Sequence, residues 1–317
     1  MCEQASNVGC EPVKVLYIAS DGRSGSTILS QVLGNLDGFV SVGELNAIWK
    51  YGLFHNFLCS CGVPFRECPF WTEVFEQAFG GFETLDAAKL IMLWHRVARF
   101  RNIPLFNLRW KPALFKERAH VYCEYQVKLY MAIQKVSGCQ VIVDSSKSPT
   151  YVHLYKTLPT VDLYVLHLVR DSRAVAYSQM KTKLRPEFPD KAIYMDQMNP
   201  IKSAIRWMIY HLALMPFVTQ QGCYTLVKYE DFVADPNNML IDIQQFMGIY
   251  PLSLSLVDDH RVRLGVSHQI SGNPVRFTRG EVMLREDDEW KAAMKTAHKR
   301  VVAALTWPLL AKYGYRL

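Results

Sequence analysis

Short apolar runs alternate with helical patterns along most of the chain. The runs at residues 15–19, 39–42, 140–143, 163–169 and 223–229 predict buried strands. Apolar positions at helical spacing follow them at 28–33, 174–180, 201–218 and 236–247, and a helix pair is expected at 290–310. This alternation predicts a three-layer α/β fold, with a mostly parallel central sheet flanked by helices.

One long segment departs from the alternation. Residues at about 80–138 read as helical throughout, with a long helix expected at 116–136. No linker separates two domains, so we expect residues 1–317 to form a single domain with this segment as a helical insertion. Basic and aromatic residues mix between Trp94 and Arg118. That mixture fits a lid over an acceptor, a membrane-facing surface, or a solvated basic face.

The first strand runs into a loop of small polar residues, DGRSGST at 21–27. Backbone amides in such a loop converge beside the positive end of the following helix, where anions bind. The nucleotide-triphosphatase loop, G-x-x-x-x-G-K-[ST], carries a lysine after its second glycine. Here the cation is Arg23, which precedes Gly25. The loop therefore predicts a P-loop-type phosphate site, but not one for ATP with magnesium.

Charged side chains follow three further strands: Glu44, Lys147 and Arg170. Open α/β sheets bind ligands at the carboxyl ends of their strands, so these residues are site candidates. Glu44 is either a proton acceptor or an acid in the first turn of the next helix. Lys147 is either a positioned cation or a surface lysine. Arg170 and Ser178, two helical turns later, are expected to hold a second phosphate.

Three cysteines lie within ten residues, at positions 59, 61 and 68. A structural zinc site needs four ligands, and His55 is the candidate for the fourth. The spacing equally leaves open a disulfide or a set of buried thiols.

The overall composition indicates which ligands, partners and cellular compartment to expect. The formal charge is +7 and the pI about 8.9, which favours anionic ligands in general. The sequence contains no zinc finger, RNP motif or dense basic tail, so nucleic acid is not an expected partner. It also contains no apolar leader and no run of roughly 20 apolar residues. We therefore expect a cytoplasmic protein without a transmembrane span, or else a lumenal domain separated from its anchor. Peripheral membrane contact stays open.

Together these motifs resemble the sulfotransferases that use 3′-phosphoadenosine 5′-phosphosulfate (PAPS). Residues 23–27, RSGST, are similar to the 5′-phosphosulfate loop of that family. Arg170 and Ser178 match its 3′-phosphate motif in residue type and spacing, and Val227 to Asp231 is similar to a further family segment. The match is nearer to the Golgi and bacterial branches. Gly43-Glu44 and Lys147 are similar to the base and the lysine of tyrosylprotein sulfotransferases.

The resemblance implies transfer of a sulfuryl group from PAPS to a hydroxyl or amine by in-line displacement, with PAP as product and no metal requirement. The acceptor is expected to be a small molecule, a carbohydrate or a peptide, and the oligomeric state is not indicated. The catalytic residues implied are Arg23, Glu44 and Lys147. The cofactor-binding residues implied are Arg23, Ser24, Gly25, Ser26, Thr27, Arg170, Ser178, Tyr229, Asn273 and Arg276.

Two other functions fit the phosphate loop. One is an ATP-dependent P-loop-type kinase, and the other is a non-catalytic protein that binds PAP or phosphate. If Glu44 is not the base, the histidines His95, His120 and His268 are the alternatives.

Overall fold

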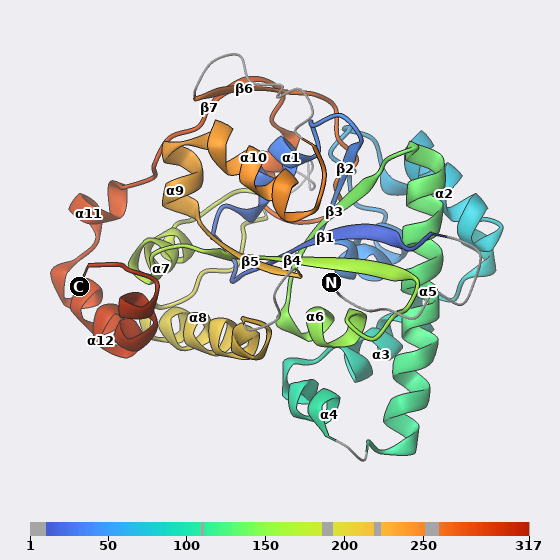
Figure 1. The fold of residues 1–317 in the computed structure, drawn as a ribbon, viewed down its shortest axis with the longest axis horizontal. Helices are drawn as coiled ribbons and strands as arrows, with labels where there is room; N and C mark the ends of the chain where they lie inside the picture. Colours follow the sequence, from blue (N-terminus) through green and yellow to red (C-terminus); the bar gives the residue numbers. More distant parts are fainter. Residues whose placement is uncertain (1–10, 109–110, 186–192, 219–222, 251–259, 317) are drawn as a thin grey trace.

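The computed structural model describes residues 11–108, 111–185, 193–218, 223–250 and 260–316. A five-stranded sheet lies at its centre, and every neighbouring pair in it is parallel (Figure 1). The strand order is β2-β3-β1-β4-β5. The strands are β1 (Val13–Ala19), β2 (Phe39–Gly43), β3 (Val141–Lys147), β4 (Val161–Val169) and β5 (Tyr224–Lys228).

The sheet is buried on both faces because its strands are apolar at consecutive positions. In β1, Leu16 and Ile18 face one apolar core, whereas Val15 and Tyr17 face the other. Successive side chains of a strand point to opposite faces, so a continuous apolar run can fill two cores at once. The five strands predicted from the apolar runs are confirmed, with small shifts at their ends.

Helices cover the two faces of the sheet. In Figure 1, α1 (Ser26–Leu33), α9 (Tyr229–Ala234) and α10 (Pro236–Phe246) lie above the strands, and α6 (Pro149–Tyr155) and α8 (Pro200–Leu214) lie below them. The first group packs with Leu16 and the second with Val15. The predicted layered architecture of helix, parallel sheet and helix is therefore confirmed.

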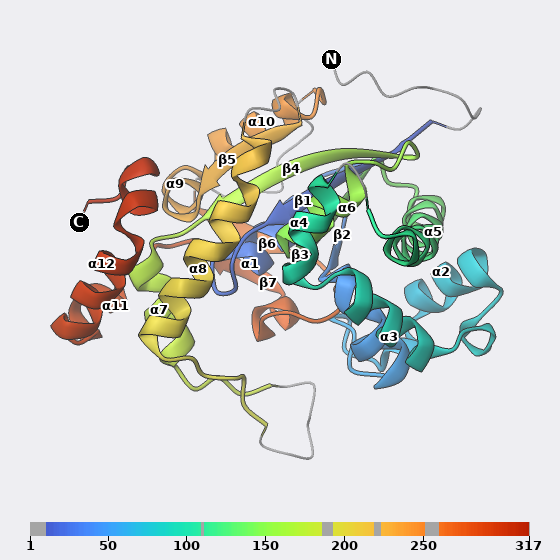
Figure 2. The same ribbon diagram turned by 90° about the horizontal axis from the view of Figure 1, so that it is seen from below.

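Most of the remaining helices gather at opposite ends of the sheet, as both views show (Figures 1 and 2). One group holds α2 (Pro69–Phe79), α3 (Ala87–Val97) and α5 (Ala113–Ser137), and the other holds α7 (Ser172–Met180), α11 (Glu289–Ala293) and α12 (Thr296–Lys312). The short helix α4 (Ile103–Asn107) lies next to α6. The helical insertion expected at 80–138 corresponds to α3, α4 and α5. That the chain is a single domain stays a prediction.

Two local expectations differ from the structure. The strand expected at 223–229 ends at Lys228, because Tyr229 already begins α9. A two-stranded antiparallel hairpin, β6 (Arg261–Leu264) and β7 (Gly280–Met283), was not predicted, since four-residue strands carry too little pattern. Part of the loop expected at 181–200 lies outside the described residues, as do Arg109 and Trp110 of the insertion. In the described part of the chain, no helix has both the length and the hydropathy that a bilayer crossing requires.

Candidate active site

The carboxyl ends of all five strands of the central sheet meet at one edge. Read across the sheet, the residues at or just beyond these ends are Glu44 after β2, Lys147 at the end of β3, the loop with Arg23 after β1, Arg170 after β4, and Tyr229 after β5. The loops that follow parallel strands form the ligand-binding edge of such a sheet. The topology thus brings together side chains that are up to 206 positions apart in the sequence.

A cavity of about 640 Å³ opens at this edge. Ten of the predicted site residues line it: Arg23, Gly25, Ser26, Thr27, Glu44, Lys147, Arg170, Ser178, Tyr229 and Asn273. The other two, Ser24 and Arg276, are buried beside it. The Ser24 hydroxyl donates to the Asp21 carbonyl, and the Arg276 guanidinium donates to the Gly272 and Leu58 carbonyls. Both side chains therefore hold neighbouring loops in place.

Gly25 determines the shape of the phosphate loop. It is the N-cap of α1 and has a φ of 89°, a conformation that side-chain-bearing residues rarely adopt. A Cβ atom at this position would lie 2.3 Å from the Tyr229 ring. The absence of a side chain lets the backbone approach Tyr229 closely, so that the first amides of α1 face the cavity.

We expect Gly25→Ala to lower the thermal stability and to weaken PAP binding at least tenfold, because both the positive φ and the Tyr229 ring oppose the new methyl group. Strain of this kind costs about 1–3 kcal/mol. Thermal unfolding and PAP titration measure the two effects. Gly138→Ala is the matched control, since Gly138 also has a positive φ but nothing within 4 Å of the added carbon. Equal losses in both variants would contradict the role of the contact with Tyr229.

Glu44 and Lys147 form an ion pair at the floor of the cavity, through Lys147 Nζ and Glu44 Oε1. The side chains are only 22% and 15% exposed, so water screens the pair less than it would at the surface. The Glu44 amide donates to the Ile270 carbonyl at 2.9 Å, and the Ser271 hydroxyl lies 3.5 Å from Glu44 Oε2. The backbone of Glu44 is therefore anchored to Ile270, while Lys147 and Ser271 contact its two carboxylate oxygens.

Backbone strain concentrates at this edge of the sheet. Among the described residues, four that are not glycine have a positive φ, and three of them line the cavity: Arg23, Lys147 and Ser271. Each such conformation costs on the order of 1–3 kcal/mol and persists only where the surrounding structure enforces it. The charged side chains of Arg23 and Lys147 are thus aimed by backbones that the loops hold in unusual conformations.

Below Lys147, the buried carboxylate of Asp144 organises the end of β3. It accepts hydrogen bonds from the Tyr130 hydroxyl at 2.6 Å and from the Ser146 amide at 2.8 Å. Burial raises the pKa of Asp144 to about 6, although the hydrogen bonds from Ser146 and Tyr130 oppose the shift. Asp144 therefore fixes the turn that presents Lys147.

Two of the cavity's arginines, the half-buried Arg23 and the buried Arg170, carry buried nitrogen atoms without a partner. Burial, together with the charge of Arg206, lowers the pKa of Arg23, and the buried Arg23 Nη1 has no hydrogen-bond partner. Arg170 is 5% exposed and donates to the Arg23 carbonyl and to Asp287, yet its Nε has no partner. Buried donors without partners are rare in proteins, so these atoms are suited to an anionic ligand.

Asp287 is the acidic neighbour of Arg170. Its carboxylate lies 3.1 Å from Arg170 Nη2. Partial burial alone would raise the pKa of Asp287, but the hydrogen bond and charge of Arg170 outweigh it and the net shift is downward. An ionised Asp287 would compete with any phosphate for Arg170.

The sequence did not identify several residues that line the cavity: Lys183, Arg185, Arg206, Tyr210 and Asp287. Arg206 lies on α8 and pairs with the buried Asp21 at 2.8 Å. Burial and the charge of Arg23 lower the pKa of Lys183. The only available signal was the cluster of basic residues at 181–185, KTKLR, immediately after the helix that carries Ser178. The histidines His95, His120 and His268 do not line this cavity.

In sequence, the chain is similar to known sulfotransferases. The model of the sulfotransferase family matches residues 16–251. Carbohydrate sulfotransferase 3 from Homo sapiens is 27% identical over 172 residues, which is 50% of this chain and 35% of the length of that relative.

Two solved structures share the fold. The sulfotransferase domain from the curacin biosynthetic pathway has a TM-score of 0.51 and 16% identity, covering 97% of this chain and 99% of its own. The sulfotransferase domain from the Synechococcus PCC 7002 olefin synthase has a TM-score of 0.52 and 17% identity, covering 99% of this chain and 98% of its own. The family model spans well over half of the chain, so this protein belongs to the sulfotransferase family.

Proposed function

We propose that this protein transfers a sulfuryl group from PAPS to a hydroxyl or amine of an acceptor. The observation that carries the proposal is the order of charged groups along one cavity. The phosphate loop with Arg23 lies between Lys147 and Arg170, and Glu44 stands beside Lys147. This order suits a nucleotide with anionic groups at two positions and a reacting bond near a carboxylate.

The donor groups present suit PAPS. The loop amides at the start of α1, together with Arg23 Nη1, are available to the 5′-phosphosulfate. Arg170 and Ser178, both lining the cavity, are available to the 3′-phosphate. Tyr229, whose ring centroid lies 4.6 Å from the Arg170 guanidinium, keeps this cation in place. Asp287 would have to release Arg170 when the 3′-phosphate binds.

The residues of the site supply charge stabilisation and a base. PAPS supplies an activated sulfuryl group, and in transfer a bond forms from the acceptor oxygen to sulfur while the bond to the bridging oxygen breaks. Glu44 takes the proton from the acceptor hydroxyl, a role worth about 10²–10⁴-fold in rate. Lys147 and Arg23 stabilise the negative charge left on the bridging oxygen, as in phosphoryl transfer.

Some cavity residues have no proposed role in binding PAPS, among them Asn46, Tyr51, Met198 and Tyr210. We assign these residues to the acceptor side of the cavity. This mixture of polar and aromatic groups suits a hydroxylated acceptor. One relative is named a carbohydrate sulfotransferase, so carbohydrates are the first acceptors to test. Peptides and small molecules follow, and the cytoplasm stays the expected compartment.

The test is a transfer assay with the full chain. PAPS with labelled sulfate is offered with carbohydrate, peptide-tyrosine, phenol and lipid acceptors, without added metal. We expect labelled product and PAP in equal amounts with at least one acceptor class. Turnover of ATP with magnesium and none of PAPS would instead establish a kinase. PAP binding without transfer to any acceptor would leave a binding protein.

A further inference from the structure

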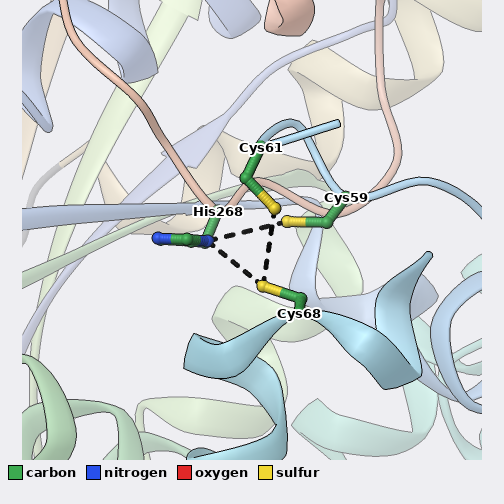
Figure 3. Close-up of side chains that lie close together, drawn as sticks. All are labelled: Cys59, Cys61, Cys68 and His268. Atoms are coloured by element: carbon green, nitrogen blue, oxygen red, sulfur yellow. Dashed lines mark hydrogen bonds between the residues drawn. The ribbon is translucent and has the colours of Figure 1, made fainter. Parts of the chain in front are cut away.

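Four potential metal ligands that do not line the cavity converge in a cluster that the proposed reaction does not use. The ligand atoms of Cys59, Cys61, Cys68 and His268 all lie within 4.8 Å of one another (Figure 3). Cys68 Sγ is 3.6 Å from Cys61 Sγ and 3.2 Å from His268 Nδ1, and Cys59 Sγ is 3.8 Å from the same nitrogen. Zn–S and Zn–N bonds of about 2.3 and 2.0–2.1 Å imply ligand separations of roughly 3.5–3.8 Å in a tetrahedral site.

The fourth member of the cluster is not the one expected from the sequence. His55, the predicted partner of the cysteines, stacks on Phe57 instead, with the ring centroids 5.1 Å apart. His268 arrives from a segment 200 positions after Cys68. Its ring stacks on Phe70 with the centroids 4.8 Å apart, and its carbonyl accepts a hydrogen bond from Trp71 Nε1 at 2.9 Å. The imidazole is therefore held with Nδ1 directed at the sulfur atoms, as Figure 3 shows.

Polar groups lie beside the sulfur atoms. The backbone N–H groups of Cys61, Val63 and Trp71 lie near the sulfurs of Cys59, Cys61 and Cys68 in turn. The Arg279 guanidinium contacts the same loop and donates to the Cys61 carbonyl at 2.6 Å. Three thiolates and one neutral imidazole around Zn²⁺ leave a net charge of −1, which such donors and this cation offset.

We propose that Cys59, Cys61, Cys68 and His268 bind one structural zinc ion. Four protein ligands leave no open coordination position, so the ion holds loops together and takes no part in catalysis. A disulfide explains the cluster less well than zinc does. It would join two of the cysteines and would not explain why the third thiol and the His268 imidazole lie beside them. All three cysteines are free thiols in the structure.

A zinc ion in this site would also stabilise the segment that positions Glu44. The 59–68 loop is bound to the segment around His268 by further contacts: the Ser60 hydroxyl donates to the Ser267 carbonyl at 2.6 Å, and the Ser60 amide to the Gln269 carbonyl at 3.1 Å. Two residues after His268, Ile270 accepts the hydrogen bond from the Glu44 amide. Zinc would thus fix the segment that supports Glu44 and continues into Ser271 and Asn273, which line the cavity.

Metal content of the purified full chain tests the proposal. We expect inductively coupled plasma mass spectrometry to find about one zinc ion per chain. Cys68→Ser and His268→Ala are expected to lose it. The matched controls are Cys139→Ser, a buried cysteine outside the cluster, and His55→Ala, both of which should keep the ion. The measurement needs neither PAPS nor an acceptor, so its failure would not bear on the proposed function.

Because a ligand variant can fail to fold, the wild-type protein supplies a second measurement. Metal is removed with a chelator and Co²⁺ is added alone. Three thiolates and one nitrogen should give intense sulfur-to-cobalt charge transfer and the visible bands of tetrahedral cobalt. Wild-type protein that purifies without zinc and takes up neither ion would overturn the proposal. So would a Cys61–Cys68 disulfide found by peptide mapping, or zinc retained by His268→Ala and lost from His55→Ala.

Discussion

Replacing Glu44 by glutamine (Glu44→Gln) is expected to lower the rate of sulfuryl transfer by about 10²–10⁴-fold, because the amide cannot accept the acceptor proton. PAP binding should change little, since the glutamine side chain keeps the shape of the carboxylate and an oxygen for Lys147. The measurement is kcat with saturating PAPS, together with PAP titration on the same preparation. A fall in kcat without a fall in affinity is the signature of a base.

The control for this variant is Glu76→Gln, an exposed carboxylate on α2. It should leave both kcat and PAP affinity unchanged. If Glu44→Gln transferred sulfate at the wild-type rate, the base would lie elsewhere. The histidines considered from the sequence would then need a rearrangement to act, because none of the three lines the cavity.

Arg170→Ala should weaken PAP binding by roughly 10²–10⁴-fold, as expected from losing a buried ionic contact worth about 3–5 kcal/mol. The effect should depend on the ligand. Adenosine 5′-phosphate, which lacks the 3′-phosphate, should bind the variant nearly as well as the wild type. Titration of both ligands against both proteins separates loss of the 3′-phosphate contact from general damage to the cavity.

Two further variants sharpen this experiment. Asp287→Asn removes the acid that holds Arg170 and should strengthen PAP binding several-fold without changing the affinity for adenosine 5′-phosphate. Arg173→Ala is the comparison on the neighbouring helix α7, since Arg173 pairs with Asp171 and does not line the cavity. If Arg170→Ala weakened both ligands equally, Arg170 would not hold the 3′-phosphate.

The sheet was predictable because its strands are read from local patterns. Val15 to Ala19 and Leu163 to Val169 are apolar runs that need two covered faces, and each ends in small or charged residues. The phosphate loop and Arg170 were found for the same reason, since strand ends in an α/β sheet carry ligands. Arg170 and Ser178 are also only two helical turns apart, so both side chains can reach the same ligand.

What the sequence did not reveal depends on contacts between distant segments. Arg206 looks like an ordinary basic residue of an amphipathic helix until α8 places it against Asp21. His268 sits in a loop without regular pattern, and the parallel bridge between Gly43 and Ile270 helps to bring its segment to the cysteines. Local periodicity carries no information about such a pairing, whereas His55 was chosen because it is near in sequence.

The strand order gives the site a fixed direction. Neighbouring strands lie about 4.8 Å apart. The strand order therefore sets the distances between the proposed base after β2, the reacting bond near β3 and β1, and the 3′-phosphate near β4. The backbone hydrogen bonds of the sheet set that spacing, and the insertion and the 181–185 segment lie outside it. Lys183 and Arg185 line the cavity, so exchange of the 181–185 segment would alter the choice of acceptor while the spacing of the donor site stays unchanged.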